Sequence, residues 1–270
     1  TYRRALFQHK CWYNIQFHRL VYVKIRNKSS ISFCFAYENL QFKYFVVVDE
    51  YHEGEEYIEN FFEEVSGTGQ SKGLIGHAIG SILKSKSKGF DAYVHASPFK
   101  NLDVLPASPS LGALEHALVS KHKIYKLRDA IKSLLGRYDR IYIDTPPAFN
   151  FFTLSALISA DKVLIPFDCD VFSQRALKTL IENVIETQDD HNDGLEIEGI
   201  VVNQFQAQAK LPRDVVQQLK DERLPVLNSM LPPSVIMKES HHKNMPLVYL
   251  NTDHKLTQAY QSLFNEIEKK

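Results

Sequence analysis

A carboxylate follows the most strand-like stretch of this 270-residue chain. In residues 138–147, Ile141 and Ile143 occupy alternate positions, Asp144 follows them, and a proline pair comes after Thr145. Alternating apolar residues predict a buried strand, and prolines, which cannot donate ladder hydrogen bonds, predict its end. Ligands of open α/β sheets bind beyond the carboxyl ends of the strands, where an Asp can hold Mg²⁺ through bound water. The alternative is a simple turn, because Asp and Pro are ordinary turn residues.

The surrounding sequence predicts the elements that would position Asp144. Residues 45–49 form a short apolar run that ends in an acid, which is typical of a central parallel strand. Further strands or extended pieces are expected at 15–25, 31–37, 93–96, 102–105, 162–167, 197–203, 226–230 and 247–249. Helices are expected at 55–65, 74–84, 111–119, 124–135 (ending near Gly136), 151–160, 173–187 (with Ser173 as N-cap), 213–222 and 255–268. This alternation favours an α/β fold with a mostly parallel twisted sheet and helices on both of its faces.

Composition favours a globular protein with no special compartment. Hydrophobic residues make up 44% of the chain, charged residues make up 24%, and the formal net charge is +0. The three cysteines, Cys11, Cys34 and Cys169, form no CxxC pair, which argues against a disulfide framework or a zinc cluster. No apolar stretch has the length of a membrane span or the flanks of a signal peptide. We therefore expect a cytoplasmic protein without a membrane partner.

The first 48 residues differ in composition from the rest. They hold eight Lys and Arg against one acid, twelve aromatic residues, and neither Gly nor Pro, which is unusual for a chain that needs turns. Residues 49–65 then hold eight acids and no Lys or Arg. We therefore divide the chain into an atypical, irregular segment, residues 1–48, and an α/β domain, residues 49–270.

Residues 138–147, together with residues 153–166, closely resemble the ParA/MinD family of partition and positioning ATPases, in which an apolar strand ends in IDxPP. The resemblance implies a P-loop NTPase-like fold, with ATP and Mg²⁺ as cofactors. It also implies that Asp144 is a catalytic residue that holds Mg²⁺ through water. The next three residues would form a switch that senses the γ-phosphate, namely Thr145, Pro146 and Pro147.

Other positions match the family less completely. Asp49 matches the first acid of a catalytic motif, but Tyr51 stands where its second acid would be. Asn203 and Pro232 match residues around the adenine base, although a turn-forming Asn is the alternative reading of Asn203. Basic residues that could bind DNA phosphates without reading sequence, or that could simply be solvated surface, are Lys210, Arg213, Lys238 and Lys243.

The family's glycine-rich phosphate loop is not recognisable in this chain. The chain has no Gly-Lys dipeptide, and its first glycine, Gly54, follows the strand expected at 45–49. The Gly/Ser run at 66–73 follows a predicted helix, so we interpret it as a loop between helices rather than a phosphate loop. Three explanations stay open: an out-of-frame or rearranged 5′ end, a degenerate paralogue, or a phosphate site built in another way.

The resemblance implies an ATPase of chromosome or plasmid partitioning. Such a protein forms a homodimer with ATP, binds nonspecific DNA, and is stimulated by a ParB-like partner. Because the phosphate loop is missing, the alternative is a non-catalytic binding or regulatory module of the same fold. The sequence leaves open whether the chain hydrolyses ATP.

Overall fold

The computed structural model describes residues 20–24, 44–48, 94–96, 99, 101–105, 111–120, 122–145, 149–243 and 245–268. These residues fall into two units, the first ending at Asp161 and the second beginning at Lys162. Residue 49, where the predicted α/β domain begins, lies outside the described residues, so that boundary stays a prediction.

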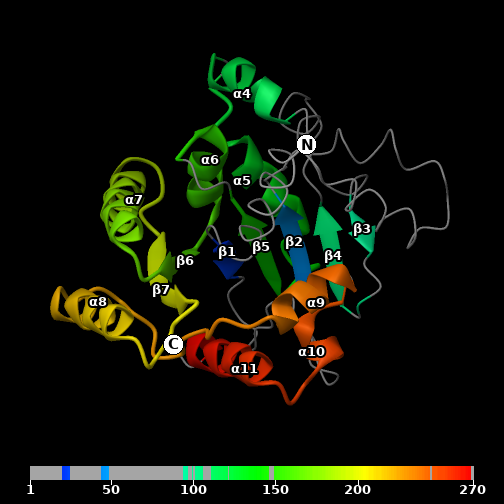
Figure 1. Ribbon diagram of the computed structural model, residues 1–270. Helices are drawn as coiled ribbons and strands as arrows, with labels where there is room; N and C mark the ends of the chain where they lie inside the picture. The colour runs from blue at the N-terminus through cyan, green and yellow to red at the C-terminus, as the bar shows by residue number, and fades with distance from the viewer. Residues whose placement is uncertain are drawn as a thin grey trace, which may run out of the picture. The chain divides into compact units, whose positions relative to one another are not determined.

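The sheet of the first unit has three parallel strands at its centre, β4 (Leu102–Leu105), β2 (Tyr44–Val48) and β5 (Arg140–Asp144). Two antiparallel strands flank them, β3 (His95–Ala96) beside β4 and β1 (Leu20–Lys24) beside β5 (Figure 1). In β5, the four residues before Asp144 are buried, as expected for a central strand covered on both faces. The predicted α/β class with a parallel sheet is confirmed, but in this unit the parallel arrangement ends at β5.

Helices follow the strands of the first unit, namely α4 (Leu111–Ser120), α5 (Lys126–Ile131), a 3-10 turn η3 (Lys132–Leu134) and α6 (Phe151–Ser159). The helix predicted at 124–135 is therefore α5 continued by η3. It ends where predicted, because Gly136 takes a φ of 89°, which glycine adopts without steric cost. Almost every side chain of α6 is buried, as its apolar sequence requires.

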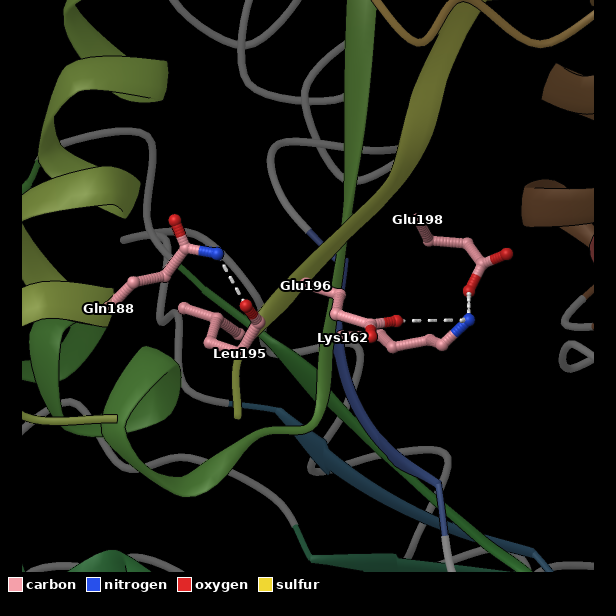
Figure 2. A network of polar contacts seen from close by, with 5 residues as sticks. All are labelled: Lys162, Gln188, Leu195, Glu196 and Glu198. Carbon is pink, nitrogen blue, oxygen red and sulfur yellow. Dashed lines mark hydrogen bonds and ion pairs between the residues drawn. The ribbon is translucent and has the colours of Figure 1, made fainter. Parts of the chain in front are cut away.

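The second unit begins with a βαβ element, in which α7 (Val171–Asp190) connects two parallel strands, β6 (Lys162–Asp168) and β7 (Glu196–Asn203). Near the end of α7, the Gln188 side chain donates to the backbone oxygen of Leu195, just before β7 (Figure 2). The remaining helices are α8 (Lys210–Asp221), α9 (Ile236–His242), α10 (Leu247–Leu250) and α11 (Lys255–Glu268).

The segment between α8 and α9 runs along the open edge of β7. Ile200 donates its N–H to Pro225 and accepts at its backbone oxygen from the N–H of Leu227, at 2.8 and 2.9 Å. The extended piece predicted at 226–230 is thus confirmed at Val226, which forms a parallel bridge with Ile200. This segment satisfies backbone groups that an edge strand would otherwise expose.

Three local predictions need correction. Residues 247–249, predicted as extended, form α10, because a short apolar run suits a strand and a buried helix equally well. Ser173 is not the N-cap of α7, since Asp170 accepts from its N–H at 2.9 Å and from its hydroxyl at 2.6 Å. Helix α8 begins at Lys210, before the expected 213, and Pro212 is tolerated because N–H groups of the first turn have no partner within a helix.

Several predictions fall outside the described residues. They are the strand at 31–37, the helices at 55–65 and 74–84, and the loop at 66–73. In the part of the chain that the structure describes, no helix is both long and apolar enough to cross a membrane.

Candidate nucleotide-binding site

Asp144 and Thr145 lie at the carboxyl edge of the first unit's sheet. In the parallel register, Asp144 pairs with Val48, the last residue of β2, so the two strands end together. Asp144 is half-buried, and Thr145 is fully buried. Asp49, the next residue after Val48, lies outside the described residues, as do Pro146 and Pro147. The predicted place of Asp144 at the sheet edge is therefore confirmed, while its role and those of the other four residues stay predictions.

The chemistry of this edge fits a magnesium ion held through water. Mg²⁺ prefers oxygen ligands, keeps several waters, and is usually bound by only one or two carboxylates together with substrate phosphates. Among the described residues, no three His, Cys, Asp or Glu side chains gather as a metal cluster. A single Asp144 carboxylate is thus suited to a hydrated ion that phosphates help to hold, rather than to a closed protein cage.

The N-terminus of α6, which follows the segment predicted to be a switch, is capped by protein side chains. The Asn150 carboxamide oxygen accepts from the N–H groups of Phe152 and Thr153, each at 3.1 Å. Glu115 of α4 accepts from the N–H of Phe151 at 3.2 Å. Helix N-termini bind anions through such N–H groups. With these groups already bonded, and with a carboxylate beside them, this helix end is not arranged to receive phosphate.

In the second unit, Asn203 lies at the carboxyl end of β7 beside Asp168 at the end of β6. The two residues pair in the parallel register, and the Asn203 amide donates a hydrogen bond to the Asp168 carboxylate. An amide has two N–H donors and one oxygen acceptor. Donation of one N–H to Asp168 leaves the oxygen to accept from a donor, and the second N–H to donate to an acceptor, on a purine edge. Nothing in the sequence of β6 alone singles out Asp168, since its role depends on the register between two strands.

The pKa of Asp168 is raised above the ordinary carboxyl value. Although the residue is exposed by its surface area, desolvation by the atoms around the carboxyl is the largest cause, and the charge of Asp170 adds to it. The hydrogen bond from Asn203 acts in the opposite direction and lowers the pKa. Asp168 is therefore an acceptor for Asn203 that loses its charge more readily than a solvated Asp.

Pro232 is brought to the same place by the backbone of Leu231. Leu231 donates its N–H to Val202 at 2.9 Å and accepts from the N–H of Phe205 at 2.8 Å. These partners stand on either side of Asn203 in the sequence, so the next residue, Pro232, lies next to the end of β7. Asn203 and Pro232, both predicted at the base, are thus brought together, and both are half-buried.

The four basic residues predicted to bind DNA lie in two pairs. Lys210 and Arg213 are on α8, whereas Lys238 lies on α9 and Lys243 directly follows it. All four are exposed. Figure 1 draws α8 and α9 well apart within this unit, so we treat the four residues as two basic sites, one at each helix.

Cys169, between two acids, has the properties expected of a structural thiol. Burial raises its pKa to about 11, and the charges of Asp168 and Asp170 add to the shift. Because the thiolate is the nucleophile, this environment makes Cys169 unreactive.

Comparison with known proteins defines the class of this fold. The family model described as AAA domain (AAA_31) matches residues 60–197, just over half of the chain. The cobyrinic acid a,c-diamide synthase of Mycobacterium smegmatis, solved with a bound ATP analog and magnesium, aligns with a TM-score of 0.65 and 20% identity over 83% of this chain and 81% of that one. A plasmid partition protein from Borrelia burgdorferi aligns with a TM-score of 0.61 and 19% identity over 83% and 86%. These likenesses show a P-loop NTPase fold.

Sequence relatives narrow the class further. The chain is 30% identical over 179 residues to the chromosome partitioning protein ParA of Myxococcus xanthus, which is 66% of this chain. It spans 63% of the length of that relative. It is 28% identical over 204 residues to the sporulation initiation inhibitor protein Soj of Bacillus subtilis, covering 75% of this chain and 80% of Soj. The chain belongs to the ParA/MinD family, as the motifs at 138–147 and 153–166 predict.

Proposed function

We propose that the protein is a cytoplasmic ATPase of chromosome or plasmid partitioning, which binds ATP with Mg²⁺, dimerises in the ATP state and then binds DNA nonspecifically. Similarity to partitioning proteins such as ParA and Soj supports a role in partitioning. The pairing of Asn203 with Asp168 beside Pro232 supports the binding of a nucleotide. That pairing is the single observation that carries the proposal, because it presents an oriented amide to a flat base. A ParB-like partner would stimulate hydrolysis.

In this proposal each residue has a defined task. Asn203 pairs with the adenine edge, Asp168 fixes the direction of its amide, and Pro232 packs against the base. Asp144 holds the hydrated metal ion, and the segment from Thr145 to Pro147 responds to the γ-phosphate. The bound Mg²⁺ would neutralise negative charge on the phosphate oxygens.

A second candidate is a non-catalytic binding or regulatory module of the same fold that no longer turns over nucleotide. Two observations favour it, namely the lack of any Gly-Lys dipeptide in the 270 residues and the capped N-terminus of α6. Most of the stabilisation of phosphoryl transfer comes from N–H groups and a Lys around the phosphates. The two candidates share the fold and differ in nucleotide turnover.

Isothermal titration with ATP and Mg²⁺ tests the base site. Replacing Asn203 by Ala removes two hydrogen bonds to the base, so the dissociation constant is expected to rise roughly tenfold to a hundredfold. Asn265→Ala, an exposed asparagine on α11, is the matched control and is expected to bind as wild type does. Absence of heat at millimolar ATP contradicts the ATPase and favours the non-catalytic module. Phosphate release, measured with and without DNA, then separates the ATPase from the non-catalytic module.

The two basic sites allow the DNA part of the proposal to be tested separately. Each phosphate contact contributes about 0.9 to the slope of log K against log salt concentration. We compare Lys210→Ala/Arg213→Ala with Lys238→Ala/Lys243→Ala, each in the presence of ATP. Replacing the pair that contacts DNA is expected to lower the magnitude of the salt slope by roughly 1 to 2. Unchanged slopes for both pairs contradict their assignment as DNA-binding residues.

A further inference from the structure

The C-terminal end of α11 is bonded to the segment that leads to Pro232. Glu266 accepts at Oε1 from the backbone N–H of Asn228 at 2.7 Å and from its side-chain Nδ2 at 3.1 Å. At Oε2, Glu266 accepts from the backbone N–H of Ser229 at 2.7 Å. Desolvation raises the pKa of Glu266, but the hydrogen bonds from Asn228 and Ser229 outweigh it and lower the pKa overall. The carboxylate is therefore held in its charged form, with both oxygens bonded to this segment.

The N-terminal end of α11 is bonded to the same segment on the other side of Pro232. The Nδ1 atom of His254 accepts from the backbone N–H of Leu256 at 3.0 Å. Its Nε2 atom lies 3.5 Å from the hydroxyl of Ser234. Because Nδ1 accepts, a neutral ring carries its proton on Nε2 and donates toward Ser234. This tautomer also means that His254 cannot accept a proton from Ser234, so the pair is a tether and not a catalytic dyad.

The helix and the loop have similar lengths between the two tethers, which are the contact of Glu266 with Asn228 and Ser229 and the contact of His254 with Ser234. From His254 to Glu266 the helix rises about 18 Å at 1.5 Å per residue. An extended chain from Ser229 to Ser234 spans about 17 Å at 3.3 Å per residue. The stretch of α11 between His254 and Glu266 is thus similar in length to the loop segment that the two residues contact. In the middle of this stretch, Leu231 is fully buried and bonds to β7 on either side of Asn203.

We infer that α11 is a clamp for the base-binding loop, in which Glu266 and His254 hold the two ends of residues 228–234 and so fix Pro232 beside Asn203. Glu266 and His254 are positioning residues, since they act through the loop and not on the nucleotide. The part of this inference that concerns binding rests on the proposed function. The consequence is that ATP affinity depends on the docking of a helix whose own side chains do not touch the base.

Glu266→Gln tests the clamp with little change of shape. The new amide can keep one acceptor, but its NH₂ group then faces an N–H donor, so that at least one bond to the loop is lost. The first measurement is hydrogen exchange at the amides of Leu231 and Phe205, which report the loop's bonds to β7 without any nucleotide. We expect exchange at both amides to become about tenfold faster. If the competent loop falls to about a tenth of the population, the dissociation constant for ATP and Mg²⁺ rises tenfold.

Glu182→Gln is the matched control, because it removes the same charge from an exposed position on α7 of the same unit. It is expected to change neither measurement. Ser234→Ala is the second variant; it removes the other tether and is expected to loosen the same two amides. Wild-type exchange rates in both tether variants overturn the clamp, whatever the nucleotide does.

The two measurements also separate the clamp from the proposed function. Faster exchange with unchanged ATP affinity overturns the link between α11 and binding. Faster exchange in a protein that binds no ATP even as wild type supports the clamp and rejects the proposed nucleotide. The double variant Glu266→Gln/Ser234→Ala adds a further check. Because both tethers hold one segment, their effects on amide exchange at Leu231 and Phe205 are expected to be non-additive.

Discussion

Lys162 and Glu198 form a buried ion pair at the amino ends of β6 and β7 (Figure 2). The Lys162 side chain is 15% exposed and that of Glu198 is 1% exposed, whereas the second partner, Glu196, lies 3.8 Å away and is 70% exposed. Glu198 reaches this position through a β-bulge, because the register shifts between Val163 and Leu164. A bulge re-aims the extra residue, here into the interior.

Replacing Lys162 by Met keeps the apolar stem and removes the charge. The Glu198 carboxylate then stays buried without the charge of Lys162, which is expected to cost about 3–5 kcal/mol of the free energy of unfolding. Glu196→Gln, in contrast, is expected to cost at most about 1 kcal/mol, because exposed pairs are screened by water. The double variant Lys162→Met/Glu198→Leu is expected to recover most of the loss, since apolar replacement of a whole buried pair is often close to neutral.

Urea unfolding followed by circular dichroism measures these differences at neutral pH. A loss of 3–5 kcal/mol is a large fraction of the total stability of a typical domain, so the midpoint moves clearly. Lys162→Met with less than about 1 kcal/mol of loss, or a double variant no more stable than the single one, refutes the reasoning. Either result means that Glu198 is solvated or bonded elsewhere and that the bulge does not serve this pair.

Three further changes have defined outcomes. A Cβ at Gly199 would lie 2.6 Å from the Leu227 side chain, so Gly199→Ala is expected to cost about 1–3 kcal/mol in urea unfolding, and Leu227→Ala in the same background is expected to relieve part of it. Because the pKa of Glu266 is lowered on folding, its contribution is present above the ordinary carboxyl pKa of about 4.3 and is lost as the pH falls through the lowered value. The stability difference between wild type and Glu266→Gln is therefore expected to vanish in acid, and a constant difference contradicts the lowered pKa. Cys169, with a pKa of about 11, is expected to react slowly with iodoacetamide at neutral pH and about tenfold faster per pH unit up to that value, which mass spectrometry measures.

The elements with strong local signals could be predicted from the sequence. Strand β4 and helix α11 have the predicted bounds, 102–105 and 255–268. The short apolar run of β4 indicates a strand, and the long amphipathic period of α11 indicates a helix. The run at 247–249 lacks such a signal, and packing decided its state, since Leu247 and Val248 are buried in α10.

The candidate site could be predicted only where a residue's role follows from its own strand. Asp144, Asn203 and Pro232 lie at strand ends or beside them, as their motifs indicate. Asp168 needs the register of two strands, and Glu266 bonds to a residue 38 positions away. An acid at the end of the strand that precedes the helix and strand leading to Asn203 is a usable sequence signal for Asp168. The contact between Glu266 and Asn228 spans too many residues to have a local sequence signal.

Asp168 and Glu266 show how two carboxylates of the same site acquire opposite properties. Asp168 receives one amide donor and has a second acid, Asp170, near it, so burial prevails and its pKa is raised. Glu266 is bonded to two backbone N–H groups and one amide, which outweigh burial and lower its pKa. Acid therefore weakens the hold of Glu266 on the segment before Pro232 only as the pH falls through a pKa below the ordinary Glu value, because hydrogen bonds to the charged form protect it from protonation.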